Sequence, residues 1–194
     1  MINRRSLLIG IDGLGGSGKT TYAYALQRQI KNCIILHLDD FIHPKKVRYN
    51  EDYEEWECYY RLQWRYDELI ETLLMPLNKG QSVHEVIEIY NKETDSYTMR
   101  EMKIPAGTIV IVEGVFLQRP ELSPFFDCVI YLDVEKELRL QRVLHRDTYI
   151  GDKEEILWKY ENRYFPAEDV YLEQCQPLER ADAVEVVAPK QVNK

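Results

Sequence analysis

The feature that most constrains this chain is an eight-residue segment, Gly-Leu-Gly-Gly-Ser-Gly-Lys-Thr, at residues 13–20. It matches the pattern G-x-x-x-x-G-K-[ST], in which a glycine-rich loop joins a strand to a helix. A short apolar run over Ser6–Asp12 predicts a buried parallel strand before the loop. Apolar residues then recur at helical spacing over Lys19–Lys31. The sequence therefore predicts a strand, a phosphate-binding loop (P-loop) and a helix in the order that the motif requires.

The residues of this loop predict that it holds the triphosphate of ATP or GTP. Glycines let backbone amides turn inward around phosphate oxygens, and the following helix adds the positive end of its dipole. Lys19 is expected to reach the β and γ phosphates, and the Thr20 hydroxyl to bind Mg²⁺. A glycine-rich turn without a ligand is the alternative, which the flanking strand and helix disfavour. The predicted nucleotide-binding residues are Gly13, Gly15, Gly16, Ser17, Gly18, Lys19, Thr20 and Thr21.

The rest of the chain alternates between strand and helix patterns. Strands are predicted at 33–38, 108–112, 128–132 and 183–187, and helices at 53–77, 136–147 and 153–174. Two alternating segments, Val83–Tyr90 and Ser96–Ile104, predict a β-hairpin with the turn Asn-Lys-Glu-Thr-Asp. Such alternation implies a parallel sheet covered by helices on both faces. The length of 194 residues fits one domain over 1–194, with the hairpin as an insertion at about 83–104.

Composition narrows the class of protein and of partner. With 45% hydrophobic and 30% charged residues, the chain has the balance of an ordinary globular protein. Its net charge of -8 disfavours a general attraction to nucleic acid. No apolar stretch is long enough to cross a membrane, and four separated cysteines without a C-x-x-C pair predict free thiols. We therefore expect a cytoplasmic protein that binds a small molecule, with neither a nucleic acid nor a membrane as partner; a homo-oligomer is compatible with the sequence.

Acidic residues follow two of the other predicted strands. Asp39 and Asp40 end the second strand, in His-Leu-Asp-Asp-Phe-Ile-His-Pro, and Glu113 ends the apolar run Ile-Val-Ile-Val-Glu. Ligands of parallel sheets bind at the carboxyl ends of the strands. Asp39 is the candidate base for an acceptor hydroxyl, and Asp40 and Glu113 are candidates for the Mg²⁺ site. Capping of a turn, or a solvated strand end, remains the alternative for each.

Three arginines, Arg139, Arg142 and Arg146, lie three and four residues apart on one predicted helix. Residues at these intervals share a helix face. Ion pairs with neighbouring acids would explain any single arginine. The stripe as a whole predicts a lid, at about 136–160, that closes over ATP with arginines bound to phosphate.

Two further patterns have less specific meanings. Asn91–Thr94 resembles the guanine-reading motif N-K-x-D of GTPases, but Thr94 replaces the aspartate, so selectivity for GTP is unsupported. The aromatic cluster Tyr53–Tyr66 is compatible with packing or with a ligand contact. Tyr60 is our candidate for a substrate contact within this cluster.

The segments GLGGSGKTT, HLDDFIHP, the IYN of the hairpin, IVIVEGVF and LRLQRVLHRD together resemble the uridine kinase family of P-loop kinases, from about Ile9 to Asp147 and more loosely to Ala183. The resemblance implies an α/β protein with the three-layer α/β/α P-loop NTPase fold, a mainly five-stranded parallel sheet, a β-hairpin insertion and a helical lid. It implies ATP-dependent phosphorylation of a nucleoside 5′-hydroxyl.

The resemblance also implies roles for individual residues. Lys19 and Thr20 match the phosphate and metal residues, Asp39 the catalytic aspartate, and Glu113 the acid near Mg²⁺. Tyr90 falls on a tyrosine that contacts the acceptor base, and Arg142 and Arg146 fall on lid arginines.

The chain departs from the family pattern around the acceptor. The lid segment R-G-R-D is replaced by Thr-Tyr-Ile-Gly-Asp-Lys-Glu-Glu, a pyrimidine-recognising histidine aligns near Asp95, and the ribose-binding aspartate has no clean equivalent, although Asp52 and Glu57 lie in its segment. Uridine or cytidine is the leading acceptor. Nicotinamide riboside, pantothenate, and a regulator that binds ATP without transferring phosphate remain the alternatives.

Overall fold

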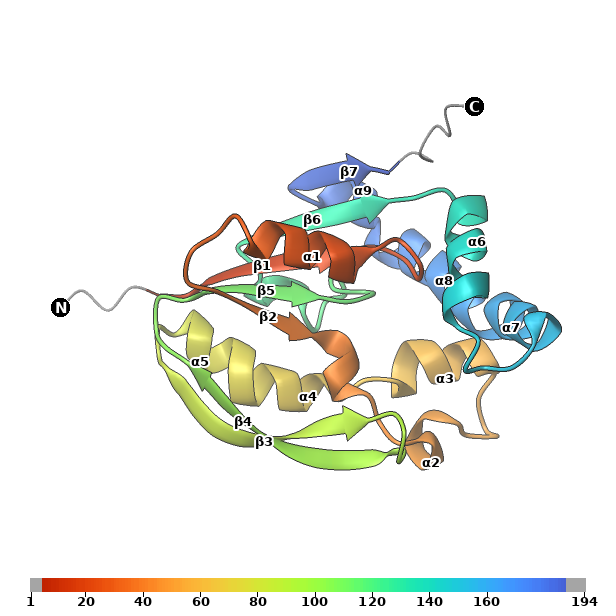
Figure 1. Ribbon diagram of the computed structural model, residues 1–194, viewed down its shortest axis with the longest axis horizontal. Coiled ribbons are helices and arrows are strands. Elements are labelled where there is room, and N and C mark those ends of the chain that lie inside the picture. Colours follow the sequence, from red (N-terminus) through yellow and green to blue (C-terminus); the bar gives the residue numbers. More distant parts are fainter. Residues whose placement is uncertain (1–4, 188–194) are drawn as a thin grey trace.

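A single five-stranded parallel sheet forms the centre of the computed structural model, which describes residues 5–187 (Figure 1). The spatial order of the strands is β2-β5-β1-β6-β7. Their bounds are β1 Leu7–Asp12, β2 Cys33–His37, β5 Ile109–Glu113, β6 Cys128–Asp133 and β7 Ala183–Val186. The α/β P-loop fold predicted from the sequence is confirmed; the ends of the expected 1–194 domain lie outside the described residues.

The two faces of the sheet are covered by different helices because successive side chains of a strand point to opposite sides. Ile11 and Ile111 pack with Ala23 of helix α1 (Lys19–Gln27) on one face. Leu8 and Val110 belong to the larger core on the opposite face. That core also contains residues of the helical stretch 66–78 and of α8 (Phe165–Cys175), so helices form the two outer layers (Figure 1).

Helix α1 begins directly at the P-loop and ends earlier than expected. Gly18, the residue before it, has a left-handed backbone conformation with φ 95°. The helix ends at Gln27 rather than at the predicted Lys31. Asn32 also adopts a positive φ of 54°, and its carbonyl accepts a hydrogen bond from the Ile109 amide at 3.1 Å. The chain leaves the helix early because it must turn here to enter β2.

The single helix predicted over 53–77 is wrong at its centre. The structure has α3 (Glu55–Leu62), a break, and then a helical stretch made of α4 (Tyr66–Leu69), a π-helical turn (Ile70–Leu74) and α5 (Met75–Asn78). At the break the Arg65 amide donates to the Phe41 carbonyl at 2.7 Å, and the His43 amide donates to the Gln63 carbonyl at 2.9 Å. These long-range hydrogen bonds replace the bonds that a continuous helix would make, so tertiary pairing overrides the local helical pattern.

The predicted hairpin insertion is present as β3 (Val83–Asn91) and β4 (Ser96–Ile104). Val83, Ile87 and Ile89 join the larger core, while the other side of the ribbon is mostly exposed. Between β2 and α3 the chain forms a 3-10 turn, η1 (Leu38–Phe41), and the short helix α2 (Lys45–Arg48). The hairpin packs beside η1, since β3 contacts this turn and Arg100 of β4 donates to Asp40 within it.

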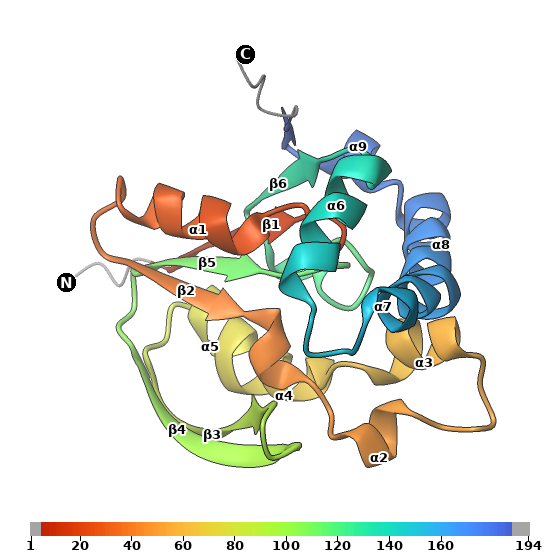
Figure 2. The same cartoon turned by 45° about the vertical axis from the view of Figure 1, so that its right-hand side comes forward.

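The C-terminal half of the chain adds a helical layer at the carboxyl edge of the sheet (Figure 2). It contains α6 (Lys136–Arg146), α7 (Lys153–Lys159), a π-helical turn (Tyr160–Tyr164), α8 and α9 (Pro177–Arg180), while the short 3-10 turn η3 (Ser123–Phe125) precedes β6. Val143, Ile156, Tyr160 and Phe165 form a separate small core between these helices. Among residues 5–187, none of the helices has both the length and the apolar character needed to cross a bilayer.

Candidate active site

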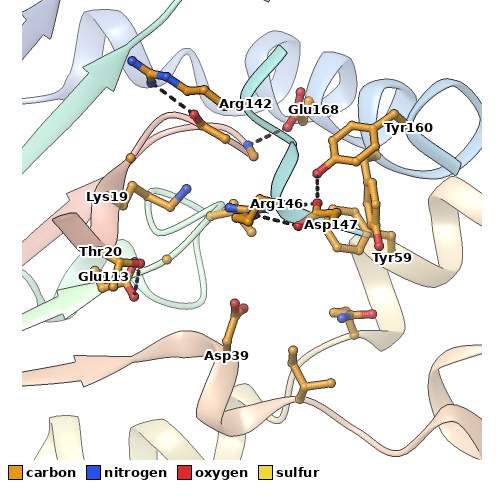
Figure 3. Close-up of a pocket in the computed structure, with 18 of the residues that line it drawn as sticks. Lys19, Thr20, Asp39, Tyr59, Glu113, Arg142, Arg146, Asp147, Tyr160 and Glu168 are labelled. Carbon is orange, nitrogen blue, oxygen red and sulfur yellow. Dashed lines mark hydrogen bonds and ion pairs between the residues drawn. The ribbon is translucent and has the colours of Figure 1, made fainter. Parts of the chain in front are cut away.

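A cavity of about 360 Å³ opens at the carboxyl end of the sheet (Figure 3). The P-loop, η1 and the end of β5 form one side, and the C-terminal helices form the other. Lys19 and Asp39 point into the space between these segments (Figure 3). The carboxyl ends of β1, β2 and β5 are adjacent because β5 lies between the other two strands. This order brings together the P-loop after β1, the aspartates after β2 and Glu113 at the end of β5.

The P-loop provides most of the predicted nucleotide site. Six of the eight predicted nucleotide-binding residues line the cavity: Gly15, Gly16, Gly18, Lys19, Thr20 and Thr21. Gly13 and Ser17 are buried within the loop and do not line the cavity. The Lys19 ammonium donates to the Leu14 carbonyl at 3.0 Å. Burial lowers the pKa of Lys19, and nearby carboxylates oppose this shift.

Thr20 and Glu113 form the candidate metal site. The Thr20 hydroxyl donates to Glu113 Oε1 at 3.1 Å. Two oxygen ligands beside the phosphate loop suit Mg²⁺, which takes few protein ligands and completes its shell with water and phosphate oxygens. In the described part of the chain, no group of three or more His, Cys, Asp or Glu residues could hold a metal ion.

His37 is a member of this site that sequence reasoning missed. Its Nδ1 lies 2.6 Å from Glu113 Oε1, and His37 pairs with Glu113 in the register of β2 and β5. Burial alone would raise the pKa of Glu113, but the hydrogen bond from His37 and the charge of Lys19 outweigh it and lower that pKa. The same hydrogen bond raises the pKa of His37. Glu113 is therefore held ionised, as a metal-associated acid must be.

The two aspartates after β2 have different surroundings. Asp39 is accessible from the cavity, yet desolvation by the enclosing protein raises its pKa, and Glu113 adds to the rise. Lys19, Arg146 and the Trp64 side chain oppose that shift. Asp40 instead forms an ion pair with Arg100 of the hairpin at 2.8 Å and does not line the cavity. The position of Asp40 thus does not support the predicted metal role; the residue ties the hairpin to the strand end.

The arginine stripe is divided between two environments. Arg142 and Arg146 line the cavity. Arg142 donates to the carbonyls of Gly16 and Ser17 at 3.2 and 3.1 Å. Arg146 pairs with Asp147 at 2.6 Å. Both remain candidates for phosphate contacts.

Arg139 does not face the cavity. The expectation that all three arginines form one phosphate-binding face is therefore wrong for this residue. It is buried and donates to the Gly15 carbonyl at 3.0 Å and to Glu168 Oε2 at 2.9 Å. The other oxygen of Glu168 accepts the Gly15 amide at 2.7 Å. Burial raises the pKa of Glu168, and Arg139 opposes this shift. This ion pair fixes the backbone of the P-loop, and no local motif in the sequence pointed to it.

The two predicted substrate tyrosines lie outside the cavity. The Tyr90 hydroxyl donates to Asp95 at 2.8 Å and accepts from Arg48 at 2.9 Å. Tyr60 is buried and lies under the Arg119 guanidinium, 4.2 Å from its ring centre. The structure does not bring either residue to the cavity. Other aromatic residues line it: Tyr59, Trp64, Tyr149, Tyr160 and Tyr164.

Comparisons with known proteins agree with this geometry. The pattern that defines the Phosphoribulokinase / Uridine kinase family matches residues 8–192. A uridine kinase of Clostridium novyi is 33% identical over 153 residues, which cover 74% of this chain and 69% of that protein. A uridine kinase of Staphylococcus epidermidis is 28% identical over 173 residues, or 87% of this chain and 83% of that protein.

Solved structures give the same result. A structure described as a possible uridine kinase from Bacillus stearothermophilus has a TM-score of 0.76 and 36% identity, covering 93% of this chain and 88% of the other. A putative fructose transport system kinase from Silicibacter, at a TM-score of 0.71 and 16% identity, shares the fold over 93% of this chain and 90% of its own. P-loop kinases of this family use ATP and a divalent metal. The chain therefore belongs to the Phosphoribulokinase / Uridine kinase family and is a phosphotransferase with an alcohol group as acceptor.

Proposed function

We propose that this protein transfers the γ-phosphate of ATP, with Mg²⁺, to the 5′-hydroxyl of a nucleoside such as uridine or cytidine. The observation that carries the proposal is the placement of Asp39 in the same cavity as the P-loop residues Lys19 and Thr20. A carboxylate beside the γ-phosphate can take the proton of an acceptor hydroxyl. The names of the similar proteins support a nucleoside as the acceptor.

The roles of the residues follow from the chemistry of phosphoryl transfer. Asp39 takes the hydroxyl proton as the acceptor oxygen forms its bond to the γ-phosphorus. The bond from that phosphorus to the β–γ bridging oxygen breaks, and ADP leaves. Lys19, Arg142 and Arg146 stabilise the negative charge that develops on the phosphate oxygens. Mg²⁺ at Thr20 and Glu113 would supply further charge neutralisation and orient the phosphates.

A raised pKa suits the proposed role of Asp39. A general base is most effective when its pKa is close to the working pH, and an ordinary exposed aspartate is too weak a base. Desolvation and the neighbouring Glu113 raise the pKa of Asp39, and Lys19 limits the rise. The carboxylate of Asp39 is therefore more basic than that of a surface aspartate.

The direct test is mass-spectrometric detection of phosphorylated products. The full chain is incubated with ATP, Mg²⁺ and a mixture of uridine, cytidine, nicotinamide riboside and pantothenate. A monophosphate of uridine or cytidine is the expected product. A product of nicotinamide riboside or pantothenate alone would reassign the acceptor. ATP binding in calorimetry with no product from any compound would identify an ATP-binding regulator and overturn the proposal.

A further inference from the structure

A second pocket, of about 260 Å³, lies between the end of β6 and helices α6, α8 and α9 (Figure 2). Within residues 5–187, Glu168 is the one residue that lines both this pocket and the active-site cavity. The volume is below the roughly 300–1,000 Å³ of pockets that hold drug-sized molecules. The walls are mainly apolar, with contributions from Leu14, Val134 and Phe165. The pocket therefore suits a small ligand with an apolar body.

Tyr131 of β6 lines this pocket, and its hydroxyl has no hydrogen-bond partner in the part of the chain that the structure describes. The side chain is only 2% exposed. Burial raises the pKa of this phenol, with further increases from Asp12 and from Glu168 and Asp133, which line the same pocket. Buried polar groups in folded proteins nearly always have a partner. The Tyr131 hydroxyl therefore marks a place where a ligand can supply one.

The charges around the pocket leave a negative excess. Arg139 and Glu168 neutralise each other through an ion pair of 2.9 Å. Lys136 is a further lining cation, and its ammonium lies 4.0 Å from the centre of the Phe165 ring. Three lining carboxylates form no ion pair and no side-chain hydrogen bond with any described residue: Asp133, Glu135 and Asp169. Three carboxylates against one ammonium favour a cationic ligand.

Asp133 is the carboxylate best placed to hold such a ligand. Glu135 and Asp169 are exposed, so solvent weakens their attraction for a cation. Asp133 is half-buried and lies two residues after Tyr131 in β6, so both side chains point to the same face of the sheet. A carboxylate and a phenol oxygen on one face can both accept hydrogen bonds from an ammonium group.

We propose that this pocket binds a small primary amine, with the ammonium group held by Asp133 and Tyr131 and the apolar body packed between the apolar walls. The site is separate from the proposed site of phosphoryl transfer and does not depend on that function. Arg139 and Glu168, which line the pocket, also hold Gly15 of the P-loop. The amine therefore binds directly beside the anchor of the nucleotide loop.

The test measures binding of phenethylamine, a primary amine with a compact apolar body, to the full chain by ligand-observed NMR titration. Phenylethanol and phenylacetate are matched probes that carry a neutral or an anionic group on the same ring. Phenethylamine is expected to bind with a Kd on the order of 1 mM, and the other two probes roughly 10-fold more weakly. Saturating ATP with Mg²⁺ should not displace the amine. Displacement by ATP would place the amine in the active-site cavity and overturn the proposal.

Point variants locate the bound amine. Asp133→Asn and Tyr131→Phe each remove one hydrogen-bonding group with little change of shape, and should weaken binding by about 10-fold and about 5-fold. Lys136→Met removes a cation that repels the amine and should tighten binding by about 3-fold, a gain that a misfolded variant would not show. Glu173→Gln, at an exposed glutamate of α8 that does not line the pocket, is the control and should leave the Kd unchanged.

Three results would each overturn the site. The first is no binding of phenethylamine, and the second is equal binding of the three probes. The third is an unchanged Kd for the amine in Asp133→Asn or in Tyr131→Phe. Phosphorylation assays on the same proteins are independent of these results, because the pocket contains none of the residues proposed to transfer phosphate.

Discussion

The backbone amide of Gly15 donates to the carboxylate of Glu168 at 2.7 Å, across 153 residues of sequence. The nucleotide loop is therefore anchored to α8, whose preceding turn contributes Tyr160 and Tyr164 to the cavity. Arg139 completes the anchor by binding both Glu168 and the Gly15 carbonyl. One helical segment thus contacts the phosphate loop and lines the cavity.

Replacing Glu168 should affect stability and ATP binding together. Glu168→Gln leaves the buried Arg139 without a counter-charge, so we expect the free energy of unfolding to fall by about 3 kcal/mol, as for other broken buried pairs. The Gly15 segment should become less ordered and ATP affinity weaker. Denaturant unfolding and ATP calorimetry measure the two effects. Glu173→Gln, at an exposed glutamate of the same helix, is the control; equal behaviour of the two variants would refute the anchor.

The paired aspartates should differ in their effect on turnover. Asp39→Asn removes the proposed base and should lower kcat by roughly 10² to 10⁴ fold, with little change in ATP affinity. Asp40→Asn loses only the ion pair with Arg100, whose side chain is half exposed, and should keep most of the activity. Product formation and ATP calorimetry on both variants decide the assignment. Wild-type turnover in Asp39→Asn would remove Asp39 from the role of base.

The pH dependence of catalysis should report the ionisation of Asp39. The base must be unprotonated, so kcat/KM should fall as the pH falls through its pKa, which lies above the ordinary value of 3.8. The charge of Arg146 lowers the pKa of Asp39. Arg146→Gln should therefore raise that pKa and move the acidic limb to higher pH. A pH–rate profile of both proteins tests this, and an unmoved or downward-shifted limb would contradict the assignment.

Two glycines of the P-loop should respond differently to alanine. Both have positive φ, 80° at Gly16 and 95° at Gly18, so alanine strains the backbone at each. A Cβ at Gly16 would also lie 2.8 Å from Val143 and 2.9 Å from the Arg139 carbonyl, whereas at Gly18 the nearest atom is 3.9 Å away. We expect Gly16→Ala to destabilise the fold by about 1 to 3 kcal/mol more than Gly18→Ala, because it pushes α6 away. Paired denaturant unfolding measures the difference, and equal losses would contradict this packing.

Much of the fold is encoded in short stretches of sequence. The five strands, the P-loop and the hairpin were predicted from apolar runs, period-two alternation and turn residues, each of which involves near neighbours in the chain. The carboxylates Asp39 and Glu113 could be assigned to one edge because parallel strands place their carboxyl ends together.

Tertiary structure decided which of the candidate residues meet. The helical pattern over 53–77 showed no sign of the break at Gln63–Arg65, because the competing hydrogen bonds come from Phe41 and His43, which lie 24 and 20 residues from their partners. The same applies to Asp40, which pairs with Arg100 across 60 residues. Local patterns determine elements through interactions between near neighbours. The pairing of buried donors, acceptors and charges between elements depends on the packed fold as a whole. This pairing determines which side chains line the cavity.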